Sequence, residues 1–99
     1  MALARSNKLP VMHAGVIFSK RILKRHDISI TDAAKLLHMS RKQTSLFVNG
    51  KSDVSIVLAK KLEVSTGVSA GFWLNVQKSY DLYVARNDLV EAEPLYTFS

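Results

Sequence analysis

The chain has 99 residues, which favours a single domain, and its 47% hydrophobic and 22% charged content is typical of a globular protein. The absence of cysteine excludes disulfides and thiolate metal sites and fits a reducing cytoplasm. No apolar run approaches the roughly 20 residues of a membrane span, and residues 1–10 lack the apolar core of a secretory signal. We therefore expect a soluble, cytoplasmic protein with no membrane partner.

The net charge of +6 is unevenly distributed along the chain. Residues 1–51 hold ten Lys or Arg and two Asp or Glu, whereas residues 52–99 hold four and six. A basic half joined to a mildly acidic half suggests that one face contacts a polyanion such as DNA. The charge alone does not exclude a basic surface that is simply solvated.

The chain opens with residues 1–12, which lack periodicity and are interpreted as a flexible basic arm. From about Ala14 to His26, apolar residues alternate with Lys and Arg, a pattern that predicts an amphipathic helix with a basic outer face. The arm is thus expected to lead directly into the first helix of a folded domain over residues 13–85.

Two short helices are predicted next, Ile30 to Leu37 and Arg41 to about Val48, joined by a tight turn. Each is preceded by a serine with a polar partner three residues later, as in a capping box: Ser29 with Asp32, and Ser40 with Gln43. The second helix stops at Asn49-Gly50, a C-terminal breaker. Two such helices form a helix-turn-helix pattern.

Two further helices follow, each after a serine cap. Ser55 precedes Ile56 to Thr66, which Gly67 ends, and Ser69 precedes Ala70 to Ala85. Residues 86–99 change in character and are interpreted as a C-terminal tail. The predicted fold class is therefore all-α, with five helices of which the last is extended.

The second helix of such a motif lies in the DNA major groove, with its N-terminal residues facing the base edges. Its apolar stripe, Thr44, Phe47 and Val48, is expected to pack against Leu36, Leu37 and Met39. The residues predicted to bind DNA lie on its other faces and at the start of the preceding helix: Ser29, Thr31, Ser40, Arg41, Lys42, Gln43, Ser45, Leu46, Asn49 and Lys51.

These residues differ in the contact that each can make. Arg41 and Lys42 can donate to guanine, whereas Gln43 can either complete the capping box or reach adenine. The hydroxyls of the preceding helix and the residues beyond Val48 suit phosphates. Leu46 is an apolar residue on an otherwise polar face, and we predict that it packs on a thymine methyl. An incidental exposed leucine is the alternative.

The last helix, Ala70 to Ala85, is apolar around most of its circumference. A single buried stripe would leave Leu74 and Leu82 without a partner, so we predict a second, intermolecular contact. The predicted surface of a two-fold homodimer comprises Phe72, Trp73, Val76, Tyr80 and Tyr83. A dimer would place two recognition helices in successive major grooves, about 34 Å apart.

The three histidines, His13, His26 and His38, do not match a compact metal-ligand spacing and have no acidic pair beside them. No nucleophile motif or phosphate-binding glycine loop occurs either. We therefore expect no metal, no cofactor and no enzymatic activity.

Two segments, "MSRKQTSLFVNGK" and "GFWLNVQKSYDLY", make residues 13–83 similar to the HigA antitoxins, a Cro/C1-type branch of the helix-turn-helix proteins. The resemblance implies a dimeric DNA-binding antitoxin that neutralises a HigB/RelE-type ribonuclease toxin and represses its own operon. The chain departs from the family pattern at Ala14, where proline is common, and at His38, where glycine is usual. It also has Thr44 where an aliphatic residue is usual and Leu46 where a polar one is.

Two other functions are consistent with the residues. One is a stand-alone transcriptional repressor with the same DNA chemistry and no toxin. The other is a protein-interaction module whose helix-turn-helix no longer binds DNA, an alternative that the outward Leu46 supports.

Overall fold

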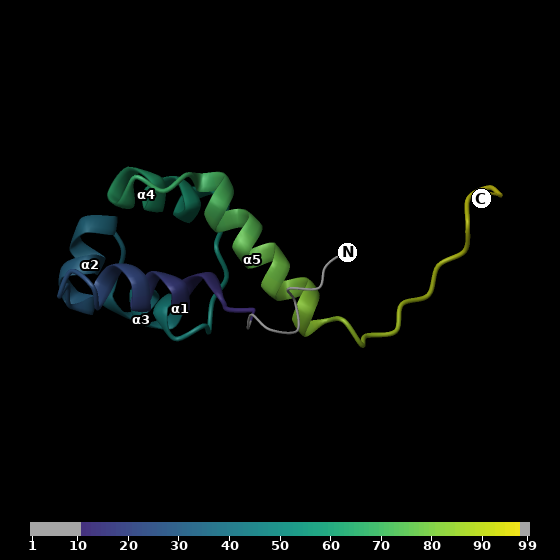
Figure 1. The fold of residues 1–99 in the computed structure, drawn as a ribbon, viewed down its shortest axis with the longest axis horizontal. Helices are drawn as coiled ribbons and strands as arrows, with labels where there is room; N and C mark the ends of the chain where they lie inside the picture. Colours follow the sequence, from purple (N-terminus) through teal and green to yellow (C-terminus); the bar gives the residue numbers. More distant parts are fainter. Residues whose placement is uncertain (1–10, 98–99) are drawn as a thin grey trace.

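The structure, a computed structural model, describes residues 11–97. Within that range all regular structure is helical, so the predicted all-α class is confirmed. The elements in chain order are α1 (Ala14–Phe18), η2 (Ser19–Leu23), α2 (Ile30–Leu37), α3 (Arg41–Val48), α4 (Ile56–Thr66) and α5 (Ala70–Val84). Figure 1 shows α1, α2 and α3 gathered at one end, α4 beside α2, and α5 leading away to the tail.

The first helix differs from the prediction of one α-helix from Ala14 to His26. It is α-helical only to Phe18 and continues as a π-helical turn, η2, in which the Lys24 N–H donates to the Ser19 carbonyl at 2.9 Å. Phe18 and Leu23 are both buried. Side chains five residues apart diverge in an α-helix of 3.6 residues per turn, and the wider π turn brings them to one face.

The core is built where the apolar faces of all six elements meet. Phe18 is at its centre, with its ring centroid 5.8 Å from that of Phe47 and 6.1 Å from that of Trp73. Leu37 and Leu62 close the core from α2 and α4. Burial of these large side chains supplies the main stabilisation of so small a domain.

The predicted serine caps are present at all four helix starts. Ser29, Ser40, Ser55 and Ser69 each accept a hydrogen bond from the backbone N–H three residues later, at 3.0–3.1 Å. The reciprocal bond of a full capping box is formed by Gln43 and, within the described residues, not by Asp32. Gly67, with φ of 78°, ends α4 in the left-handed conformation expected of glycine.

Contrary to the prediction, Leu36 does not pack against α3. It is 67% exposed, because the buried positions of α2 are Ala33, Ala34 and Leu37, on the other side of the helix. The two small alanines allow the close approach of α2 to its neighbours. Leu37 and Met39 do join the core, so the prediction was wrong only for Leu36.

One segment precedes the helical domain and another follows it. The arm predicted at residues 1–12 lies almost entirely outside the described residues. After α5 the chain makes one turn and then runs without regular structure as far as residue 97. No helix among residues 11–97 combines the length and apolar character needed to cross a membrane.

Candidate DNA-binding surface

One face of α3 is buried in the core, and the opposite face is exposed. Thr44, Phe47 and Val48 are buried, as the sequence predicts. Thr44 also donates its hydroxyl proton to the Ser40 carbonyl at 3.0 Å, which satisfies a polar group in the core. The opposite face, with Arg41, Lys42 and Leu46, is therefore exposed to solvent.

The start of α3 is held by a full capping box. Gln43 N–H donates to the Ser40 hydroxyl at 3.0 Å, and Ser40 N–H donates to Gln43 Oε1 at 3.2 Å. Bidentate recognition of adenine requires both the oxygen and the nitrogen of a glutamine amide. Since Gln43 Oε1 is engaged at Ser40, the structure favours the capping role that the sequence left open for this residue.

The end of α3 turns sharply before the next segment. Asn49 donates its side-chain N–H to the Ser45 carbonyl at 2.8 Å, and Gly50 has φ of 73°. The Asn49 amide nitrogen is thus bonded to its own helix instead of being aimed outward. Lys51 follows with an exposed side chain, in a position that suits a phosphate contact.

The turn between α2 and α3 is fixed by His38. This residue adopts the left-handed conformation, with φ 55° and ψ 49°. Its carbonyl accepts a hydrogen bond from Lys61 Nζ of α4 at 3.0 Å. A non-glycine residue in this region carries a conformational cost, and the bond from α4 helps to offset it.

The start of α2 lies beside the start of α3. Ser29 caps α2, and in the next turn Thr31 Oγ1 accepts a hydrogen bond from Arg41 Nε at 3.0 Å. The sequence suggested Thr31 only as a phosphate contact. A bond between side chains ten positions apart has no signature in sequence periodicity, which is why this pairing was not predicted.

Leu46 is on the exposed side of α3, as predicted, and is 40% exposed. Its other side borders a shallow hollow of about 300 Å³ between α3 and the start of α4, which Met39, Val57 and Leu58 also line. Leu46 therefore borders this hollow with part of its side chain, and it lies one helical turn after Lys42.

The apolar circumference of α5 divides into an inner and an outer face. Assigning Trp73 to a dimer surface was wrong: its side chain is 1% exposed and belongs to the core of the single chain. Tyr80 is half-buried, with its ring 5.3 Å from that of His13. Phe72 is 41% and Tyr83 45% exposed, so these two remain available to a second copy.

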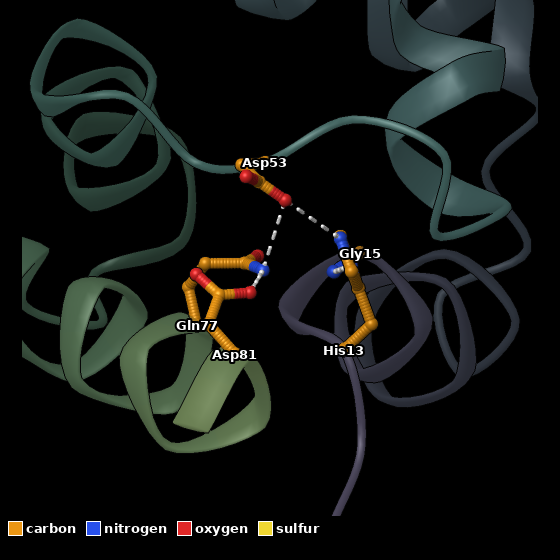
Figure 2. Close-up of polar contacts among 5 residues, drawn as sticks. All are labelled: His13, Gly15, Asp53, Gln77 and Asp81. Atoms are coloured by element: carbon orange, nitrogen blue, oxygen red, sulfur yellow. Dashed lines mark hydrogen bonds and ion pairs between the residues drawn. The ribbon is translucent and has the colours of Figure 1, made fainter. Parts of the chain in front are cut away.

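A polar cluster that sequence reasoning missed joins α5 to the rest of the domain (Figure 2). Buried Gln77 of α5 donates to Asp53 Oδ1 at 3.2 Å and to Asp81 Oδ1 at 2.9 Å. Asp53, in the loop between α3 and α4, is also 3.8 Å from Nε2 of buried His13. The cluster therefore links the start of α1, the loop after α3, and α5.

His13 has a second role in this cluster, as the N-cap of α1. Its Nδ1 accepts a hydrogen bond from Gly15 N–H at 2.9 Å, so the ring proton is assigned to Nε2, which faces Asp53. No group of three His, Asp or Glu side chains within residues 11–97 is arranged to hold a metal ion.

Comparison with known sequences reveals relatives of similar length. The chain is 33% identical over 85 residues to virulence-associated protein I of Dichelobacter nodosus, which covers 86% of this chain and 79% of that protein. It is 30% identical over 81 residues to the uncharacterized HTH-type transcriptional regulator YbaQ of Escherichia coli, covering 82% and 72% of the two chains. No family model matches the chain.

Solved structures with the same fold include proteins bound to DNA. The Pseudomonas aeruginosa antitoxin HigA, solved with the higBA promoter, has a TM-score of 0.77 and 29% identity, covering 88% of this chain and 100% of that one. Another Pseudomonas aeruginosa protein, solved in complex with a 28-base-pair operator, has a TM-score of 0.73 and 30% identity over 77% and 84% of the chains.

Proposed function

Because the chain belongs to the HigA-type antitoxins, a family of helix-turn-helix proteins, we propose that it binds operator DNA in a sequence-specific manner and represses its own operon. The observation that carries this proposal is the outer face of α3, where Arg41, Lys42 and Leu46 are exposed on a helix capped at its start. The same fold in Pseudomonas aeruginosa HigA was solved with promoter DNA.

Each part of this surface has a distinct task in the proposed complex. Arg41, Lys42, Ser45 and Leu46 face base edges from the first turns of α3, the part of a recognition helix that enters the major groove. Lys51 and the capped start of α2 at Ser29 contact phosphates, which sets the register on the duplex. The bonds that Gln43 and Asn49 make within α3 support its two ends.

We propose that the protein binds as a two-fold dimer through α5. Phe72, Val76, Ser79 and Tyr83 follow one another at spacings of four, three and four residues, the spacing of a helix–helix seam. Phe72, Ser79 and Tyr83 are exposed and Val76 is half-buried. Two such stripes in contact would bury apolar surface that a single chain leaves in water.

Family membership also supports a protein partner. We infer that the chain neutralises a ribonuclease toxin of the HigB/RelE type, encoded beside it, and represses the shared operon best when the toxin is bound. The second candidate is a repressor without a toxin, which its similarity to an HTH-type transcriptional regulator favours. A small, basic, ribonuclease-like product encoded next to this gene that copurifies with the chain would decide for the first.

The DNA-binding proposal is tested by titrating the full chain against the region upstream of its own gene and against random duplex. We expect protection of a two-fold symmetric site, tighter binding than to random duplex, and affinity that falls steeply as salt rises. Binding that is absent, or insensitive to salt, would instead support a protein-interaction module.

A further inference from the structure

The bond between Arg41 and Thr31 stands apart from the other polar contacts of this surface. Arg41 Nε donates to Thr31 Oγ1 at 3.0 Å, and both side chains are exposed. A hydrogen bond that water can replace on both sides contributes little to folding. Its main consequence is geometric, since it fixes the direction of a long side chain on the face proposed to enter the major groove.

The bond leaves a defined set of donors on Arg41. A guanidinium has five N–H donors, and the one on Nε points to Thr31. The four on Nη1 and Nη2 remain, and two of them, one from each nitrogen, form an end-on fork of parallel donors. Two parallel donors match the N7 and O6 acceptors that guanine presents in the major groove.

Thr31 is well placed to act as an anchor. It lies in the first turn of α2, which Ser29 caps, and as a β-branched residue it has restricted rotation at χ1. Arg41 begins α3, which the Ser40–Gln43 box caps. Lys61 bonds to the His38 carbonyl in the turn between the two helices. Lys42, the neighbouring cation, has no such anchor among the described residues.

We propose that Thr31 is a positioning residue for base recognition: it holds Arg41 with the Nη1/Nη2 fork toward the groove and makes guanine the preferred base opposite Arg41. The inference rests on the proposed DNA binding and adds the base to be read and the residue that selects it. A direct phosphate contact by the Thr31 hydroxyl is the competing role. The two roles predict different effects of removing the Thr31 hydroxyl. Loss of a phosphate contact weakens binding to every sequence alike, whereas loss of the bond to Arg41 lowers discrimination at the base pair that Arg41 reads.

The test begins with selection of preferred duplexes from a random library by the full-length protein. Substituting each base pair of the selected site and comparing wild type with Arg41→Ala identifies the pair that Arg41 reads. We expect a G·C pair there, with 7-deazaguanine, which lacks N7, weakening wild-type binding about fivefold or more.

Thr31→Val and Thr31→Ser are then compared on the same duplexes. We expect Thr31→Val to lower discrimination at the Arg41 position about three- to tenfold, with less than a twofold change on random duplex and an unchanged melting temperature. Thr31→Ser keeps the hydroxyl and should bind like wild type. The 7-deazaguanine effect should shrink in Thr31→Val and vanish in Arg41→Ala.

Three results would overturn the inference while leaving DNA binding intact: equal losses on selected and random duplexes in Thr31→Val, unchanged discrimination in that variant, or a base other than guanine at the Arg41 position. The 7-deazaguanine measurement uses the wild-type protein, so its result does not depend on whether a variant folds. A library selection that yields no sequence preference would overturn the proposed function itself.

Discussion

Gly15 packs against Phe47 so closely that a Cβ at residue 15 would overlap the Phe47 carbonyl oxygen. The contact joins α1 to the end of α3, and both residues are buried. The distance between these two helices is therefore set by the absence of a side chain.

Replacing Gly15 with alanine should lower the free energy of unfolding by about 2–3 kcal/mol, even though alanine is the better helix former, because α1 would have to move away from α3. Urea denaturation measures the change. Gly71→Ala is the matched control: it lies in α5 with only the Ser69 hydroxyl near its added Cβ, at 4.0 Å, and should be neutral or slightly stabilising. Similar effects of the two substitutions would contradict the packing argument.

Gln77→Glu tests the polar cluster of Figure 2. The substitution keeps the size of the side chain but places a third carboxylate beside Asp53 and Asp81, in a buried position. We expect the free energy of unfolding to fall by about 2–3 kcal/mol at neutral pH, and by less in acid, where protonation of the carboxyls removes the repulsion. Asn75→Asp makes the same charge change on the exposed side of α5 and should have an effect below about 0.5 kcal/mol.

The substitution Thr44→Val tests the contribution of the buried Thr44 hydroxyl to stability. Its partner, the Ser40 carbonyl, also accepts a hydrogen bond from the Thr44 backbone N–H at 3.0 Å, so losing the hydroxyl leaves no orphaned acceptor. We expect Thr44→Val to change the free energy of unfolding by less than about 1 kcal/mol. Thr44→Ala leaves a cavity in a closed core and should cost about 1–3 kcal/mol. A large loss in the valine variant would show that the hydroxyl itself is required.

If the proposed dimer forms, substitutions on different faces of α5 should change the dimer dissociation constant to different extents. Phe72→Glu places a charge in the proposed seam and should raise the dimer dissociation constant by more than about tenfold, measured by sedimentation. Leu82 is 68% exposed on another face of the same helix, so Leu82→Glu should leave the dissociation constant nearly unchanged. If Leu82→Glu is the variant that dissociates the dimer, the seam lies elsewhere on α5.

Leu46 is predicted to lie against a thymine methyl in the operator. Replacing that thymine by uracil removes only the methyl, and a buried methyl contributes up to about 0.8 kcal/mol, so affinity should fall about two- to fourfold. The Leu46→Ala variant should bind the thymine and uracil duplexes with equal affinity, because it lacks the side chain proposed to contact the methyl. This variant is therefore the control. Equal affinities of wild type for both duplexes would make Leu46 an incidental surface leucine at the edge of the hollow between α3 and α4.

Local features of this fold were predictable because each depends on neighbours within four residues. The serine caps, the buried stripe Thr44–Phe47–Val48 and the stop at Asn49-Gly50 are of this kind. Such features are enough to define a helix-turn-helix.

Features that depend on distant contacts could not be predicted in the same way. Phe72 and Trp73 are adjacent on a helix that is apolar on most sides, and only the position of Phe18 decides which of them is buried. The Thr31–Arg41 bond spans 10 residues and the Gln77–Asp53 bond spans 24. Neither leaves a periodic trace in the sequence.

The cluster of His13, Asp53 and Gln77 has a consequence for the DNA as well as for the fold. Asp53 follows α3 closely, whereas Gln77 lies midway along the helix proposed to carry the second protomer. In a dimer formed through α5, this cluster would hold the angle between α5 and the rest of each protomer. That angle sets the distance between the two α3 helices. The number of base pairs between operator half-sites would then depend on an amide and a carboxylate that lie outside the proposed DNA-binding surface.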